Sequence, residues 1–263
     1  IKKPPSPIIP MISEIRIRAF RATDDPETCQ KFIFGHRKVL ENHGIEKVTS
    51  STDAWMYDTS VFVVVVESLD REKLFGGVRI HCVDGKSKLP IEIATEDMDP
   101  KIRDVVKKYA QYGTAELCGL WNSIEVAGFG IGSLFPTRAA IVLLEQLGLQ
   151  SLFFLCSPFT LRFHKWLGSR LLKEVGNEGT FYYPKFDLLA TAVVLEDAVN
   201  IPLCHPREKA KVFSMRDNLT MTTHEKSPFK NLDMVVQNDL LLPNAFKDEF
   251  VLGKEAPLKI IQE

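Results

Sequence analysis

Three alternating glycines in the segment 127–133, Ala-Gly-Phe-Gly-Ile-Gly-Ser, form the pattern in this chain that most clearly suggests chemistry. Glycine has no Cβ, so such a segment can turn sharply and aim several backbone N–H groups at one ligand. The apolar run that follows predicts a helix over 133–147, ended by Gly148. A helix start attracts phosphate through its unpaired N–H groups and its dipole. The glycines alone therefore indicate either a phosphate-binding turn or a tight turn needed for close packing.

Two nucleotide-binding motifs fit this turn poorly. A P-loop ends in Gly-Lys-Ser/Thr, whereas Gly132 is followed by Ser133 and Leu134. A dinucleotide-binding turn needs a glycine where Ser133 stands and an acidic residue at the end of the next strand. That strand is expected to end in Cys156 and Ser157, and neither residue is acidic.

The elements that position the turn follow from hydrophobic periodicity and from helix start and stop signals. Helices are expected at 26–40, 99–111, 133–147 and 158–167. Strands are expected at 14–22, 61–67, 74–83, 115–121, 152–156, 188–195 and 209–215. A short charged turn joins the strands at 61–67 and 74–83, which is typical of an antiparallel pair.

This order predicts one principal domain with two appendages. Residues 1–12 are rich in proline and are expected to form an extended N-terminal arm. Residues 13–216 are expected to form the domain itself. Residues 217–263 are polar and aperiodic, and are expected to form a C-terminal extension that packs on the domain or on a partner subunit.

The composition of the chain limits the classes of protein to which it can belong. The net charge is -1, with 33 basic and 34 acidic side chains, so nothing at the level of the whole chain favours nucleic acid as a partner. The 5 cysteines form no CxxC pair or metal-ligand pattern, which favours free thiols in the cytoplasm and no metal site. The longest apolar stretch, 61–66, is too short to span a membrane.

The order of expected elements resembles the GNAT superfamily of acyl-CoA N-acyltransferases. Its central motif, Gln/Arg-x-x-Gly-x-Gly/Ala, is matched at Gly130-Ile131-Gly132, with Ala127 at the Gln/Arg position. A later family pattern, Tyr four residues before Gly, is similar to His164 through Gly168. The resemblance implies an α+β fold, a three-layer α/β sandwich whose central sheet is mixed, mostly antiparallel and flanked by helices.

A narrower resemblance covers about residues 30–170. Its order and rough spacing are similar to the signature positions of the acyl-homoserine-lactone synthases and N-acyl amino acid synthases. The matching segments are His36-Arg37-Lys38-Val39-Leu40, Asp53 with Tyr57-Asp58, Gly77-Val78-Arg79-Ile80, Leu89-Pro90 and Ala115-Glu116-Leu117. The resemblance implies acyl transfer from an acyl thioester, either acyl-CoA or an acyl group carried on the phosphopantetheine of acyl carrier protein, with no tightly bound cofactor.

Acyl transfer to an amine needs a base for the amine and a proton for the leaving thiolate. Glu116, on the strand before the glycine turn, is the candidate base, because burial within a sheet raises a carboxyl pKa. A salt-bridged carboxylate is the alternative. His164 is the candidate proton donor, or else a packed histidine. Cys156 could form an acyl-cysteine, although a buried apolar thiol is the simpler interpretation.

The resemblance also assigns binding residues. The pantetheine arm is expected to pair with the backbone of Leu120, Trp121, Asn122 and Ser123, and the phosphates with Gly128, Phe129, Gly130, Ile131, Gly132 and Ser133. Arg37 and Arg79 are the candidates for an acceptor carboxylate, because a guanidinium can bind one in bidentate fashion. Trp55 is expected to order a loop over the acceptor, or to pack.

The sequence therefore predicts an N-acyltransferase that acts on the amine of a small amino acid-like acceptor, and it could form a homodimer. Gly119, Ala127 and His164 differ from the family pattern. They leave open a catalytically silent GNAT-like domain that binds acyl-CoA or a protein partner. Acetylation of a protein lysine is a further alternative.

Overall fold

The computed structural model describes residues 12–45 and 53–253. One mixed β-sheet lies at its centre. Its strands are β1 (Glu14–Arg21), β2 (Val61–Glu67), β3 (Leu74–Cys82), β4 (Thr114–Asn122), β5 (Ser151–Cys156), β6 (Arg170–Leu171), β7 (Thr180–Tyr182), β8 (Leu189–Leu195), β9 (Thr222–Lys226) and β10 (Asp233–Asp239). The strand order is β6-β8-β5-β4-β3-β2-β1-β10-β9, and β7 also pairs with β8. Only β4 with β5 and β1 with β10 are parallel among these pairs.

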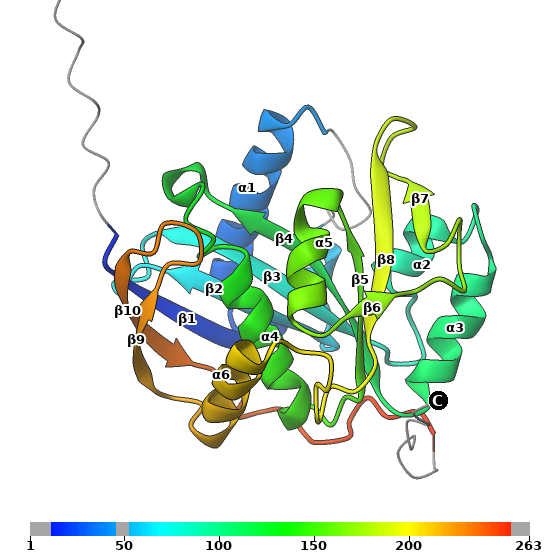
Figure 1. Cartoon of the computed structure of the whole chain (residues 1–263). Helices are drawn as coiled ribbons and strands as arrows, with labels where there is room; N and C mark the ends of the chain where they lie inside the picture. The colour runs from blue at the N-terminus through cyan, green and yellow to red at the C-terminus, as the bar shows by residue number, and fades with distance from the viewer. Residues whose placement is uncertain (1–11, 46–52, 254–263) are drawn as a thin grey trace, which may run out of the picture.

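Helices cover both faces of the sheet (Figure 1). The α-helices are α1 (Pro26–Asn42), α2 (Pro90–Thr95), α3 (Lys101–Ala110), α4 (Leu134–Gln146), α5 (Pro158–Trp166) and α6 (Pro206–Asp217). Short 3-10 turns lie at η1 (Ala22–Asp24), η3 (Ala54–Tyr57) and η4 (Ile124–Val126). α4, α5 and α6 lie on one face, and α1, α2 and α3 on the other. The predicted three-layer fold with a mixed, mostly antiparallel sheet is confirmed.

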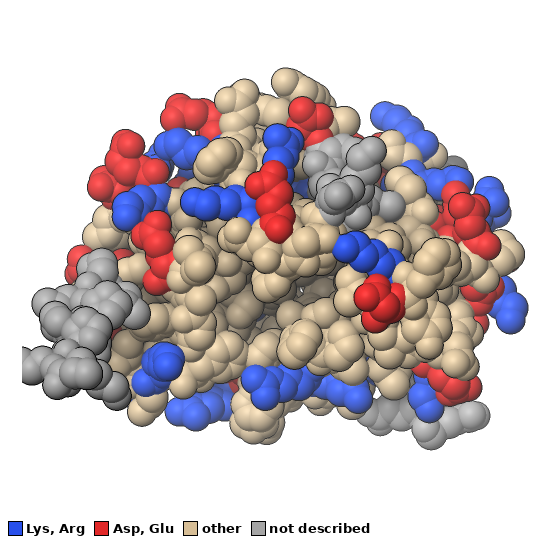
Figure 2. Space-filling view, turned by 90° about the horizontal axis from the view of Figure 1, so that it is seen from above, with Lys and Arg blue, Asp and Glu red and all other residues tan. Residues whose placement is uncertain are grey.

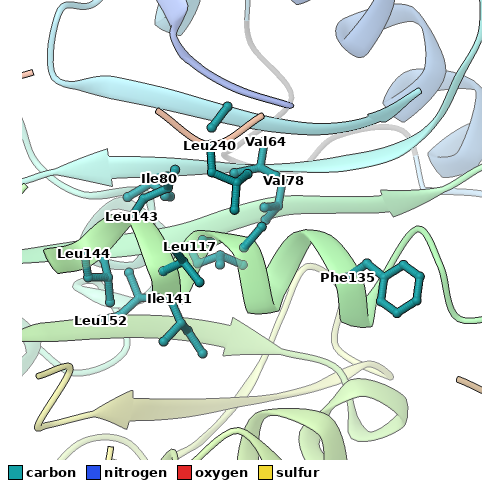
Figure 3. Close-up of a cluster of buried hydrophobic side chains, with 14 of the residues drawn as sticks. Val64, Val78, Ile80, Leu117, Phe135, Ile141, Leu143, Leu144, Leu152 and Leu240 are labelled. Carbon is teal, nitrogen blue, oxygen red and sulfur yellow. The ribbon is translucent and has the colours of Figure 1, made fainter. Parts of the chain in front are cut away.

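The core is divided by the sheet into layers. β2 is buried along its whole length because both of its faces are covered. Val64 and Val66 pack toward α4, whereas Val63 and Val65 pack toward α1. Figure 3 shows the α4 side, where Ile141 and Leu144 of the helix meet Leu117, Leu152 and other strand residues. This packing fixes α4, and therefore the turn before it, against the centre of the sheet.

The prediction of a strand at 209–215 is wrong, because these residues belong to α6. The buried side chains Glu208, Val212 and Met215 recur with helical spacing. His205 caps the helix start and Pro206 occupies its first turn, which is a start signal that the prediction overlooked. The short elements α2, β6 and β7 were also not predicted.

The C-terminal segment contributes two strands to the sheet. β10 lies parallel to β1 and pairs with the hairpin partner β9. Met234, Val236 and Asn238 are buried on alternate positions, so a strand period was present within the polar composition. Most of the predicted arm, 1–11, and the end of the extension, 254–263, lie outside the described residues.

Candidate functional site

The parallel strands β4 and β5 part in the middle of the sheet. Their pairing runs from Thr114 with Ser151 to Leu117 with Phe154 and ends there. β5 stays paired with β8 as far as Cys156 on its other edge. β4 contains a bulge after Cys118 in its pairing with β3, and Gly119 has a left-handed backbone there, with φ of 61°. Beyond Leu117, the facing edges of β4 and β5 are therefore open to a ligand.

A cavity of about 270 Å³ occupies this split, hereafter the split cavity. Most of the residues that line it come from β4, β5, α1, α2 and α5, and the loops after β5 and β7 add two more. They include Glu116, Cys118, Gly119, Leu120, Phe154, Cys156, Ser157, Thr160, His164, His36 and Tyr183. Figure 2 shows a hollow at the centre of the face seen from above, walled mainly by uncharged residues. Backbone groups and a few titratable side chains therefore provide the polar surface of the split cavity.

Glu116 is the acidic residue of the split cavity and is 2% exposed. Its Oε2 accepts a hydrogen bond of 2.6 Å from the backbone N–H of Ile91 at the start of α2. Burial raises the pKa of Glu116 to about 8, against the smaller opposing effects of the Ile91 N–H and of Arg79. A carboxyl group with a pKa near the working pH is suited to general-base chemistry.

Two histidines also line the split cavity. His164 lies on α5, its ring centroid 4.4 Å from that of Phe154, and its Nδ1 has no hydrogen-bond partner among the described residues. Burial lowers the pKa of His164 to about 4, so its imidazole is neutral at pH 7. His36 on α1 also has its pKa lowered to about 4, by burial and by Arg79. His36 belongs to a motif noted in the sequence but was not predicted as a site residue.

Glu116 and His164 approach the split from opposite faces of the sheet. Glu116 bonds to α2, on the face that also carries α1. His164 belongs to α5, on the face that carries α4. The structure therefore brings the two predicted catalytic residues to one cavity.

The three predicted acceptor residues have different positions. Arg79 is buried on β3, with its guanidinium carbon 4.4 Å from the Trp55 ring centroid. Gly119 leaves room for it, because a Cβ there would lie 2.9 Å from Nε and Nη2 of Arg79. Arg79 and Trp55 thus lie behind the cavity wall at Gly119. Arg37 is exposed on α1 and does not line the split cavity.

The glycines of the turn are needed for two different reasons, which are backbone conformation and close packing. Gly128 and Gly130 have positive φ of 79° and 77°, which glycine adopts without strain. Gly132 instead allows close packing, because a Cβ would lie 2.2 Å from Asn122 Oδ1. The Gly132 N–H donates to that oxygen at 3.0 Å. Within the described part of the chain, the N–H groups of Gly128, Gly130 and Ile131 have no hydrogen-bond partner.

The four residues of segment 120–123, predicted to pair with pantetheine, have four different positions and contacts. Leu120 lines the split cavity. Trp121 is buried on the α1 side, with its ring 5.8 Å from that of Phe32. Asn122 holds the glycine turn, and the Ser123 side chain caps η4 by accepting from Glu125 N. Phe129 and Ser133 belong to the turn itself, where the Phe129 N–H already donates to Val126 O and the Ser133 N–H to Gly130 O.

Cys156 is buried, donates to the carbonyl of Thr191, and has its pKa raised to about 12 by burial, as a structural thiol would. No cluster of three or more potential metal-ligating side chains occurs in residues 12–45 and 53–253. None of the helices in these ranges has the length and apolarity that a membrane span requires.

Solved structures with a similar architecture are known. No protein-family model and no curated protein matches the sequence. Among solved structures, FeeM, an N-acyl amino acid synthase from uncultured soil microbes, superimposes with a TM-score of 0.50 at 17% identity, over 74% of this chain and 93% of that one. The CoA-dependent acyl-homoserine lactone synthase MesI gives 0.46 at 14% identity, over 76% and 95%. The mosquito protein arylalkylamine N-acetyltransferase-like 5b gives a TM-score of 0.46 at 14% identity, over 68% of this chain and 98% of that one.

The strand order, the split between β4 and β5 and the glycine turn before α4 define the class of fold. The chain has the GNAT-like acyl-CoA N-acyltransferase fold, as the sequence predicted. The superposition with FeeM supports the same fold, and at 17% identity that likeness concerns the fold alone.

The packing of the glycine turn can be tested with Gly132→Ala. The new methyl group would clash with Asn122 Oδ1 and with the backbone oxygen of Phe75, so we expect a loss of about 1–3 kcal/mol in the free energy of unfolding. Urea denaturation measures it. In an Asn122→Ala background the loss should shrink, because one of the two clashes is gone. An equal loss in both backgrounds would contradict this account of Gly132.

The burial of Glu116 can be tested through stability. Its pKa is about 4.5 in the unfolded chain and about 8 when folded, so between these values the unfolded state binds fewer protons and the folded state loses stability as pH rises. Glu116→Gln removes this loss. We expect the variant to be more stable than the parent by about 3 kcal/mol at pH 7, with no such gain at pH 4. Denaturation curves at several pH values measure the difference.

The control for this experiment is Glu125→Gln, which changes a carboxylate that is 51% exposed on η4. This variant should show no pH-dependent gain. A Glu116→Gln curve parallel to the parent curve from pH 4 to 8 would contradict the burial argument.

Proposed function

We propose that this protein is an N-acyltransferase that moves an acyl group from an acyl thioester to the amine of a small amino acid-like acceptor. The observation that carries the proposal is the Glu116 carboxyl at the split between β4 and β5, buried and with its pKa raised to about 8. It stands in a fold whose solved neighbour at a TM-score of 0.50 is described as an N-acyl amino acid synthase.

In this mechanism the thioester enters from the α4 and α5 face. The glycine turn binds its phosphates through the N–H groups of Gly128, Gly130 and Ile131. The extended arm behind the phosphates contains amide groups, and pairs with the open strand edges at Cys118–Leu120 and Leu155–Cys156. N–H groups on these edges also stabilise the negative oxygen that forms on the thioester carbon.

The acceptor enters from the α1 and α2 face. The Glu116 carboxylate removes a proton from its amine, and the amine nitrogen attacks the thioester carbon. A C–N bond forms, the C–S bond breaks, and the thiolate leaves. Glu116 returns its proton to that sulfur through water, so the products are an amide and a free thiol. The buried positive charge of Arg79 favours an acceptor that carries a carboxylate.

His164 acts in this mechanism as a hydrogen-bond donor and not as the proton donor that the sequence suggested. With a pKa of about 4 its imidazole carries no excess proton at pH 7 to give to the sulfur. The neutral ring can still donate one N–H hydrogen bond to the developing thiolate. Its role is therefore to stabilise the leaving group.

Turnover tests this proposal directly. The chain is incubated with acyl-CoA of short, medium and long chain, or with acyl carrier protein thioesters, and with amino acids as acceptors, and free thiol is measured. We expect kcat to rise with pH and to level off above about pH 8, as Glu116 ionises. Glu116→Gln should lower kcat roughly 10²–10⁴-fold while thioester binding is retained.

Glu125→Gln serves as the matched control and should leave kcat unchanged, because its side chain is exposed and lies outside the split cavity. Full kcat in Glu116→Gln would overturn the catalytic assignment. Thioester binding without turnover by the parent chain would favour the alternative of a catalytically silent binding domain.

A further inference from the structure

One end of the molecule carries large apolar side chains that the described residues leave uncovered. Phe186 is 97% exposed and Phe159 is 86% exposed, and Tyr182 and Leu189 are also exposed. Phe186 lies in the turn between β7 and β8, and Phe159 lies in the first turn of α5. We call these four residues the apolar end. Large exposed apolar patches mark surfaces that contact another molecule or a membrane.

The two segments that carry the apolar end border the split cavity. Tyr183, which begins the turn after β7, lines that cavity together with Ser157 and Thr160 from the start of α5. Lys185 Nζ donates to the carbonyl of Gly44 at 2.6 Å, which places the turn beside the end of α1. The β7–β8 turn, α1 and α5 all reach the top of the molecule in Figure 1, and Figure 2 shows this end with its central hollow. The apolar end therefore lies where the split cavity meets the surface.

Backbone hydrogen bonds hold the β7–β8 turn in one conformation. The Tyr183 N–H donates to the carbonyl of Leu188 at 2.8 Å, and the Leu188 N–H donates to the carbonyl of Lys185 at 3.1 Å. Just before and after the turn, Tyr182 and Leu189 are cross-strand partners, so their side chains are neighbours on one face of the hairpin. The hairpin thus presents a preformed apolar tip, which loses less conformational entropy on binding than a flexible loop would.

The segments at this end carry more basic than acidic side chains. Residues 36–44, 157–163 and 182–189 contain four Lys or Arg and two Asp or Glu, a difference of +2, and all six side chains are exposed. They are Arg37, Lys38, Arg162, Lys185, Glu41 and Asp187. Exposed rings beside basic side chains suit an anionic lipid surface, because the rings enter the boundary between headgroups and acyl chains and the cations are attracted to the negative headgroups.

We propose that the apolar end docks this protein on the surface of a membrane that contains anionic lipid. Phe159 and Phe186 enter the lipid, and the hydroxyl of Tyr182 stays at the level of the headgroups. Tips that project from two separate segments suit lipid, which adapts to them, whereas a protein partner would need a surface of matching shape. Docking at this end also fits the proposed function, because an acyl chain that leaves the split cavity here would pass directly into lipid.

Co-sedimentation of the full chain with vesicles tests the docking surface without any turnover. We expect binding to vesicles of phosphatidylcholine mixed with phosphatidylglycerol, and weaker binding at high salt or to phosphatidylcholine alone. Phe159→Ser/Phe186→Ser should lower the partition coefficient about tenfold or more, because two rings no longer enter the lipid. The matched control is Phe246→Ser, which changes a ring that is 72% exposed in the segment after β10, at the bottom of Figure 1, and should bind like the parent. Equal binding by the parent and the double variant, or no binding by the parent, would overturn the proposal.

Tryptophan fluorescence shows which end of the molecule meets the lipid. Vesicles with brominated acyl chains should quench the added tryptophan of Phe186→Trp and not that of Phe246→Trp, with the parent chain as the background. Equal quenching of the two would contradict docking through the apolar end. A parent chain that binds no vesicles but forms dimers, which Phe159→Ser/Phe186→Ser dissociates, would assign this end to a second copy. Glu116→Gln should bind vesicles like the parent, because Glu116 is buried, so a failure of acyl transfer and a failure of docking are separate results.

Discussion

The parting of β4 and β5 is the constraint on which the rest of the site depends. Backbone N–H and C=O groups at the centre of a sheet normally bond to a neighbouring strand, and leaving them without a partner costs free energy. Here the pairing stops at Leu117 and Phe154 although both strands continue. The bulge at Gly119 turns β4 aside, and β8 holds β5 in place on its other edge. The exposed edges then provide a preformed surface for an extended, amide-containing ligand.

The same parting connects the two faces of the sheet. In an unbroken sheet, Glu116 on the α2 side and His164 on the α5 side would be separated by backbone. At the split they line one cavity, and burial shifts the pKa of Glu116 up and that of His164 down. Desolvation thus prepares the carboxyl as a base and keeps the imidazole neutral. Both effects arise from position in the fold and need no charged neighbour.

Local sequence patterns predicted much of the fold, because glycine turns, helix starts and buried strands leave signals within a few residues. Most helices and strands, the glycine turn and the place of Glu116 on a strand followed from such signals, whereas the three-layer arrangement followed from the family resemblance. α6 was predicted as a strand although its buried residues recur with helical spacing, and the strand period of β10 was hidden among polar residues. Arg79 behind Gly119, His36 in the split cavity and Phe229 against Gly130 depend on contacts between distant segments, which no local pattern encodes.

The parallel pairing of β10 with β1 has a consequence for how the chain folds. β1 begins at residue 14 and its neighbour β10 at residue 233, so one edge of β1 stays unpaired until β10 is available. Contacts of such long sequence separation form late, because closing a long loop costs entropy before the contact is gained. During synthesis, β1 therefore keeps an open strand edge until the β9–β10 hairpin has formed, and such an edge promotes aggregation.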